Sequence, residues 1–113
     1  MIEVIVYNYL KNELEDVPVY MEIPELLPGK FVVIEKTGSG IENHIKSATF
    51  AIQSYADSMF NAASLNEVVK EKMLDIIGEK EVTKVSLNSD YNFTDVNIKK
   101  YRYQAVFDIK HYW

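Results

Sequence analysis

The spacing of hydrophobic residues changes along the chain from helical to strand-like and back. From residue 2 to residue 15 they recur at intervals of three and four, which predicts a helix. Its apolar stripe comprises Ile2, Ile5, Val6, Tyr9, Leu10 and Leu14. Pro18 ends the helix, because the residue before a proline avoids the α region. Val19–Ile23 alternates and predicts a short strand, and Phe31–Lys36 predicts a central strand that is apolar on both faces.

The passage from Ser47 to Ile77 joins a strand to a helix with almost no loop. Ser47–Tyr55 alternates with a period of two, as a strand with two unlike faces does. From Asp57 to Ile77 the period becomes that of a helix, with Asp57 as a suitable N-cap and Gly78 as a suitable end. Residues 64–67 also spell a capping box, so a short turn followed by a helix from Leu65 is an alternative. The apolar stripe continues upstream of that box and favours one helix.

Two further strands are predicted after this helix. Val82–Asn88 alternates as a half-exposed strand does, and 101–112 forms the last strand. Thr37–Gly40 is expected to be a turn or loop tip, and 37–44 and 88–98 are expected to be exposed loops. The predicted order is α-β-β-β-α-β-β in a single domain, residues 1–113. This is an α+β fold, a mostly antiparallel sheet of about five strands with an N-terminal helix and one long helix packed on it.

Composition narrows the classes of function. The chain has 113 residues, a net charge of −5 and a single arginine, Arg102, so it is poorly suited to gripping phosphate backbones. It has no cysteine, which excludes disulfides, thiolate metal sites and cysteine nucleophiles. The N-terminus does not have the pattern of a signal peptide, and no apolar stretch is long enough to span a membrane. Tyr is common near the C-terminus, where it suits either a strand or a protein interface.

No pattern in the sequence indicates catalysis, a cofactor or a metal. Thr37–Gly40 lacks the Gly-Lys-Ser/Thr of a phosphate loop and does not lead into a helix. His44 has no second ligand at zinc-like spacing. Asp108 and His111 are separated by an odd offset, which places them on opposite faces of a strand. We therefore expect a protein that is not an enzyme and that holds neither cofactor nor metal.

Two segments resemble one family of structural proteins. The run Thr49-Phe50-Ala51-Ile52-Gln53-Ser54-Tyr55-Ala56-Asp57-Ser58 is similar to the strand-to-helix join of phage tail terminator, or tail completion, proteins of long-tailed phages and prophages. Arg102-Tyr103-Gln104-Ala105-Val106-Phe107-Asp108-Ile109 resembles the last strand of that family. The order of predicted elements agrees along nearly the whole chain.

The resemblance implies a virion protein that forms an oligomeric ring, commonly a hexamer. Such a ring caps the tail tube, ends its polymerisation and presents the head–tail joining surface. The implied partners are further copies of the chain, the tail tube protein and the head connector protein, with DNA passing through the ring without being gripped and with no membrane. The implied location is the virion tail, assembled in the bacterial host cytoplasm.

Exposed loops are the expected contact elements of such a ring, because loops carry binding residues on a rigid scaffold. The candidate assembly-interface residues are Thr37, Gly38, Ser39, Gly40, Glu42, Asn43, Asp90, Tyr91, Asn92 and Phe93. Deletion of Thr37–Gly40 is accordingly expected to spare the fold and impair assembly. The alternatives are another head–tail connector or tail tube subunit, or a non-viral adaptor or ligand-binding domain that dimerises through the Tyr-rich last strand.

Overall fold

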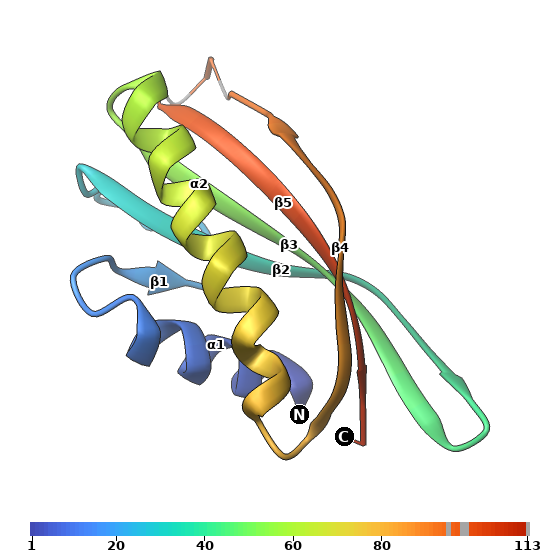
Figure 1. Cartoon of the computed structure of the whole chain (residues 1–113). Coiled ribbons are helices and arrows are strands. Elements are labelled where there is room, and N and C mark those ends of the chain that lie inside the picture. The colour runs from blue at the N-terminus through green and yellow to red at the C-terminus, as the bar shows by residue number, and fades with distance from the viewer. Residues whose placement is uncertain (95, 98–99, 113) are drawn as a thin grey trace.

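The computed structural model describes residues 1–94, 96–97 and 100–112, and its element order is the predicted one (Figure 1). The helices are α1 (Ile2–Glu13) and α2 (Met59–Leu74), the second followed by a 3₁₀ turn, η1 (Asp75–Gly78). The strands are β1 (Val19–Tyr20), β2 (Lys30–Glu42), β3 (Ile45–Ala56), β4 (Val82–Asn92) and β5 (Tyr101–His111). They form one sheet in the order β1-β2-β3-β5-β4, antiparallel except for the β1–β2 pair. The predicted α+β fold is therefore confirmed.

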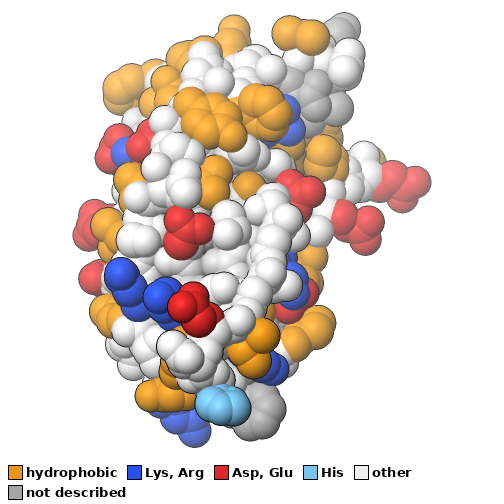
Figure 2. All heavy atoms as spheres, turned by 90° about the vertical axis from the view of Figure 1, so that its right-hand side faces the viewer, with side chains coloured by type: hydrophobic (Ala, Val, Ile, Leu, Met, Phe, Trp, Pro, Cys, Tyr) orange, Lys and Arg blue, Asp and Glu red, His pale blue; other side chains and the backbone are white. Residues whose placement is uncertain are grey.

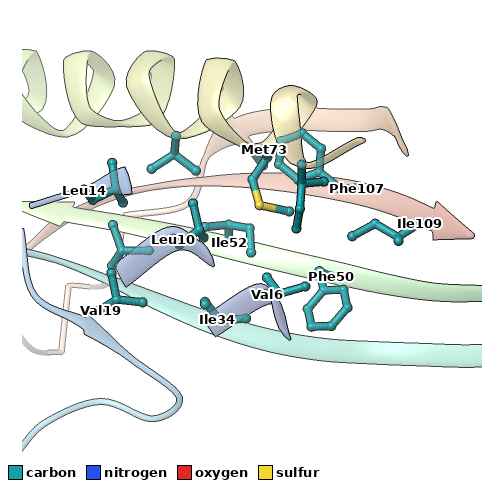
Figure 3. Packing of buried hydrophobic residues seen from close by; sticks show 14 of the residues in the cluster. Val6, Leu10, Leu14, Val19, Ile34, Phe50, Ile52, Met73, Phe107 and Ile109 are labelled. Atoms are coloured by element: carbon teal, nitrogen blue, oxygen red, sulfur yellow. The ribbon is translucent and has the colours of Figure 1, made fainter. Parts of the chain in front are cut away.

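Both helices cover the same face of the sheet, and the main core lies between these two layers (Figures 1 and 3). The alternation of β3 sends Phe50 and Ile52 toward the helices, and the neighbouring strand β5 adds Phe107 at the same level. Val6 and Leu10 from α1 and Met73 from α2 meet these side chains, because the helical period places them on the buried stripe. Apolar burial of this kind is the main stabilising term of a domain this size.

The opposite face of the sheet is open and mostly polar, with one small apolar cluster. Phe31, Val33 and Tyr55 are buried there, and Tyr20 packs against them. The rings of Phe31 and Tyr55 stack with their centroids 4.5 Å apart and an interplanar angle of 7°. Phe31 and Tyr55 are cross-strand partners, so the β2–β3 register alone brings the two rings together.

The long helix is continuous, which confirms the preference for one helix over a turn and a later start. Its cap differs from the prediction. Ser58 is the N-cap, and its hydroxyl accepts a hydrogen bond from the Asn61 amide at 3.1 Å. Asp57, the predicted cap, instead forms an ion pair with Lys100. The helix ends at Leu74, and Gly78 closes the 3₁₀ turn that follows.

The prediction of a loop over 37–44 is wrong. Residues 37–42 continue β2, and the turn lies at Asn43 and His44, whose φ angles are 52° and 67°. Positive φ at both central residues is the geometry of a two-residue hairpin turn that matches the strand twist. Gly38 and Gly40 therefore lie within a strand. A Cβ added at Gly40 would come within 3.1 Å of the Ser47 hydroxyl oxygen across the hairpin, whereas one at Gly38 would meet open space.

Two other boundaries also differ from the prediction. The first strand is only Val19–Tyr20, because residues 21–23 leave the edge of β2 and are exposed. The predicted loop 88–98 begins later, since β4 continues to Asn92 across a bulge between Leu87 and Ser89. Asp95 and Ile98 of that predicted loop lie outside the described residues.

One hydrogen bond between the helices gives a testable pH dependence. The Tyr9 hydroxyl donates to the Lys72 carbonyl in the last turn of α2 at 2.6 Å. Burial, followed by the negative charge of Glu13, raises the pKa of Tyr9 from 10.0 to about 12. A raised pKa means that this stabilisation is complete below pH 10 and is lost as the pH rises through about 12.

We expect Tyr9→Phe to destabilise the fold by about 1 kcal/mol at neutral pH. Between pH 10 and 12 the wild type loses this advantage, so the two urea-unfolding midpoints converge. A difference that stays constant up to pH 12 would contradict the role assigned to this hydroxyl. Tyr7→Phe is the matched control, since Tyr7 lies on the same helix and is partly buried like Tyr9, and its hydroxyl makes no hydrogen bond within the described residues.

Candidate assembly surfaces

The outer part of the β2–β3 hairpin is almost entirely exposed. We call residues 37–46 the arm; it extends past both helices (Figure 1). All β2 residues from Glu35 to Glu42 are exposed, whereas the four before them are buried. The outer edge of β2 is paired with β1 only as far as Val33, and no described strand pairs with it beyond that residue. The outer edge of β3 is paired with β5 as far as Lys46. The arm thus presents an open strand edge, the kind of edge to which another chain can add.

Six of the predicted interface residues lie on this arm. Ser39 faces the helix side of the sheet, and Gly38, Gly40 and Glu42 face the open side. Thr37 occupies a bulge between Lys36 and Gly38, where its hydroxyl donates to the Thr49 carbonyl at 3.4 Å. Asn43 forms the turn. The structure therefore brings these residues together, on an ordered strand and turn instead of the predicted loop.

A groove of about 710 Å³ lies on the helix side of the arm, against the start of α1. Its rim carries two very exposed apolar side chains, Met1 at 74% and Ile41 at 67%. Its charged groups are Glu3, Lys36 and Lys46. Glu3 pairs with Lys36 at 3.0 Å, and its pKa is lowered, first by hydrogen bonding to the backbone and then by Lys36. The groove is therefore apolar at the rim, and its described lining includes the Glu3–Lys36 ion pair and Lys46.

Three connections converge at the far end of the sheet, and Lys100 ties them together. Its ammonium group donates to the Pro28 carbonyl at 3.0 Å and forms an ion pair with Asp57. One side chain thus links the connection before β2, the join from β3 to α2 and the start of β5. The Lys100 side chain is 11% exposed but that of Asp57 is 68% exposed, so water screens this ion pair and its contribution to stability is small.

The only arginine of the chain completes this end of the molecule. The Arg102 guanidinium donates to the Tyr55 hydroxyl at 2.9 Å and to the Phe93 carbonyl. It also lies over the Phe93 ring, 4.1 Å from the centroid, a cation–π contact. The Phe93 amide in turn donates to the Arg102 carbonyl at 2.7 Å. Arg102 therefore fixes the first residue after β4 against the sheet.

The remaining predicted interface residues, Asp90–Phe93, lie at this end, away from the arm. Asp90 is engaged within the chain, because its carboxylate contacts Lys70 at 3.2 Å and Asn66 at 3.4 Å. Contacts with Glu67 and Asp90 raise the pKa of Lys70. Asn92 accepts from the Thr94 amide and hydroxyl, as in an Asx turn. Tyr91 and Phe93 stay partly exposed, with their rings in an edge contact at 5.8 Å.

Large apolar side chains are exposed around the Lys100 junction. Figure 2 shows hydrophobic side chains gathered toward the top, where Figure 1 places the start of α2 and the β4–β5 connection. The most exposed are Leu26 at 88%, Val96 at 81% and Phe60 at 79%. We call Leu26, Phe60, Phe93, Val96 and Tyr101 the apolar end. Exposed apolar surface of this extent is typical of an interaction site.

Sequence reasoning missed both the groove and the Arg102 contacts. The Arg102 contacts depend on the sheet register, which brings together Tyr55 and Arg102, and the groove depends on the packing of α1 against the hairpin. The sequence feature that could have indicated the Arg102 contacts is a single arginine among tyrosines in a predicted strand. Gln53, Gln104 and Tyr91 form a similar hydrogen-bonded row across β3, β5 and β4.

Across the described ranges, no three His, Cys, Asp or Glu side chains lie together as metal ligands would. His111 is buried under the helix layer, and His44 is exposed at the hairpin turn. Among the described helices, none has the length and hydrophobicity needed to cross a bilayer. The chemistry that these surfaces offer is an open strand edge, exposed apolar side chains and a few charges.

No family model matches the chain, and a search of curated proteins found no match.

Proposed function

We propose that the chain is a structural virion subunit that caps a phage tail tube, ends its polymerisation and forms the head–tail joining surface as an oligomeric ring. The partners in this proposal are further copies of the chain, the tail tube protein and the head connector protein. Support comes from the resemblance of the strand-to-helix join, from the fold and from the two surfaces described above.

The exposure of the arm is the main support for this proposal. Its β2 half is exposed on both faces, so it contributes little to the core of its own chain. Ordering a residue costs about 1–2 kcal/mol of conformational entropy, which a strand normally recovers by packing. Contact with another chain would provide that packing.

The two ends of the molecule are not equivalent, which favours a ring over a simple dimer. The arm and its groove lie at one end of the sheet, and the apolar end lies at the other. A contact between unlike surfaces is heterologous, and it generates a closed ring when the rotation between copies closes.

The charges agree with a channel through which DNA passes without being gripped. The chain carries a net charge of −5. Its single arginine is bound to Tyr55 and Phe93, and four lysines form ion pairs with carboxylates in the described structure. The net charge is thus negative and the arginine is engaged within its own fold, whereas affinity for DNA comes mainly from cations that neutralise phosphates.

The alternative of a dimer formed by pairing of last strands is disfavoured by the topology. The last strand, β5, is an interior strand that pairs with β3 on one side and β4 on the other. It therefore has no free edge for a second copy.

Two measurements test the proposal. Light scattering and negative-stain electron microscopy of purified protein are expected to show a ring of uniform size. Added to the tail tube protein encoded beside its gene, the chain is expected to shorten the tubes, since a cap blocks the growing end. A monodisperse dimer, or incorporation along the tube as a tube subunit, would overturn the proposal. A metabolic operon around the gene would also count against it.

A further inference from the structure

The sheet has two free strand edges of similar length, one on each side (Figure 1). β1 covers β2 only as far as Val33, so residues 34–42 have an open outer edge. On the other side β4 is the last strand, and no described strand pairs with its outer edge. An unpaired edge offers a row of backbone donors and acceptors to which a strand of another chain can add.

The strand directions within one chain suit these two edges to each other. β4 pairs antiparallel with β5, β5 with β3, and β3 with β2, so β4 runs antiparallel to β2. A rotation about an axis along the strands therefore places β4 of one copy beside β2 of the next as an antiparallel pair. All copies then turn the same face of the sheet toward the axis. This contact joins unlike edges, so it is heterologous and generates a ring when the rotation closes.

The irregularities of the two strands also match. Thr37 is an extra residue in β2, and Asn88 is an extra residue in β4, so each strand has one bulge here. In an antiparallel register with Glu42 opposite Lys84, the two bulges lie side by side, and the side chains stay on matching faces before and after them. The last residue of β4 then reaches the point where β1 begins to cover β2. Residues 34–42 and 84–92 thus fit each other along their whole length.

The charges at the two edges are complementary. Lys84 and Lys110 are exposed cross-strand partners on the open face, so two positive charges lie opposite each other. The neighbouring carboxylate, Asp108, accepts hydrogen bonds from two other side chains. Glu42 is exposed on the same face at the end of β2, and no ion pair of the described structure includes Glu42 or either lysine. Like charges directly opposite destabilise a sheet, so a carboxylate beside these lysines is stabilising.

Pairing of two identical edges is less favourable. The open side of residues 34–42 carries two charged side chains, Glu35 and Glu42, so two β2 edges bring carboxylates together. Two β4 edges leave the facing lysines without a carboxylate from β2. Like-charge juxtaposition of this kind selects against a symmetric contact.

We propose that residues 34–42 of one copy pair antiparallel with residues 84–92 of the next copy, with Glu42 opposite Lys84. This contact rests on the ring assembly proposed above, and it makes the sheets of neighbouring copies continuous around the ring. The candidate interface residues of the arm and those of β4, which lie apart within one chain, meet at this contact.

Charge reversal tests the register. We expect Glu42→Lys or Lys84→Glu alone to raise the concentration at which rings form by about three- to tenfold, since each contact then opposes like charges. The double variant is expected to assemble near the wild-type concentration, because the pair is present in exchanged form. An equimolar mixture of the two single variants is also expected to recover, since every contact between unlike variants is complementary.

Glu35→Lys is the matched control. Glu35 is an exposed carboxylate on the same face of the same strand, but in this register it lies opposite Tyr91 and not opposite a lysine. This variant should assemble as the wild type does, and its combination with Lys84→Glu should not restore assembly. Equal losses from Glu35→Lys and Glu42→Lys, or a double variant of Glu42 and Lys84 without recovery, would overturn the register.

Disulfide trapping tests the strand pairing without relying on charge, because the chain has no cysteine. Residues directly opposite in antiparallel strands have Cα atoms about 4.5–5.5 Å apart, a distance that a disulfide can span. We expect a chain carrying both Glu42→Cys and Lys84→Cys to form, under mild oxidation, a ladder of covalent oligomers up to the size of the ring. Glu35→Cys combined with Lys84→Cys should form no ladder. Dimers from Glu42→Cys alone would show that two arms meet symmetrically and would overturn the inference.

Light scattering of the wild type separates this inference from the proposed function. Rings that form without cross-linking between positions 42 and 84 would overturn the strand pairing and leave the ring assembly standing. A wild type that stays monomeric at all concentrations would overturn the ring itself, and the strand pairing with it.

Discussion

A chain that lacks Ile41, Glu42, Ile45 and Lys46 is expected to fold as a monomer and to fail to assemble. These residues form the last two cross-strand pairs before the turn, Glu42 with Ile45 and Ile41 with Lys46. Their removal leaves Gly40 opposite Ser47 beside the same Asn43-His44 turn. Hydrogen-bonded and non-hydrogen-bonded pairs alternate along an antiparallel hairpin, and side chains alternate between the two faces of the sheet. Because two pairs are removed, both alternations are preserved in the shortened hairpin.

The effect on stability is expected to be small. The deleted side chains are exposed or half-buried, and β5 loses only the pairing of His111 with Lys46. We expect a loss of about 1 kcal/mol, which is small beside the roughly 5–15 kcal/mol of a domain this size. The effect on assembly is expected to be complete, since the arm becomes about 7 Å shorter and the rim of the groove loses Ile41.

His44→Gly is the matched control for this deletion. It changes the tip of the arm but keeps its length, and glycine adopts the positive φ of 67° more readily than histidine does. This variant should assemble normally and be slightly more stable. Light scattering and thermal unfolding of all three proteins provide the test. Normal oligomers of the shortened chain would show that the arm is not an interface.

Deletion of Thr37–Gly40 is a poorer experiment than the sequence implied. These residues pair with 47–49 in the structure, so their loss leaves one strand of the hairpin without its partner. The sequence pattern of two glycines around a serine resembles a turn, and glycine is depleted in strands. The turn formed instead at Asn43 and His44, where asparagine tolerates positive φ. The turn predicted at Thr37–Gly40 from local composition therefore lies too early in the chain, and the observed turn is at Asn43 and His44.

The elements themselves were predictable because their patterns are long. The stripe of Val6 and Leu10 in α1 and the alternation of Phe50 and Ile52 in β3 follow directly from burial on one face. Boundaries were less predictable, since they depend on tertiary partners. Asp57 was a plausible cap by its chemistry, but the ion pair with Lys100 engages its carboxylate, and Ser58 caps the helix instead.

The candidate surfaces were predictable only in part. The sequence assigned the candidate residues of the arm to a loop, whereas they form a strand and a turn, and the groove beside the arm requires the packing of α1 against the hairpin. Asp90 was placed in an exposed loop, yet its carboxylate faces α2, because a bulge in β4 sets which side chains turn toward the helix. A register of this kind is not visible in one sequence.

The second large effect is expected from Tyr55→Ala, which removes the central side chain of the open face. Tyr55 is fully buried, stacks on Phe31 and accepts a hydrogen bond from Arg102. Truncation of a buried aromatic side chain costs about 3–5 kcal/mol, and here it also leaves Arg102 without its hydroxyl partner. Tyr55 belongs to the segment that resembles the tail terminator family, so that segment holds the fold together and positions the apolar end.

Tyr55→Phe separates the two contributions. It keeps the stack on Phe31 and removes only the hydroxyl, so a loss of about 1–2 kcal/mol is expected. Urea unfolding gives both values from the midpoint and slope. Amide exchange adds a local readout, because the Phe93 amide donates to the Arg102 carbonyl and should exchange faster once Arg102 is released. Equal destabilisation by Tyr55→Ala and Tyr55→Phe would mean that the hydroxyl, and not the stacked ring, stabilises this face. An unchanged exchange rate of the Phe93 amide in Tyr55→Phe would mean that Arg102 holds the end of β4 without the hydrogen bond to Tyr55.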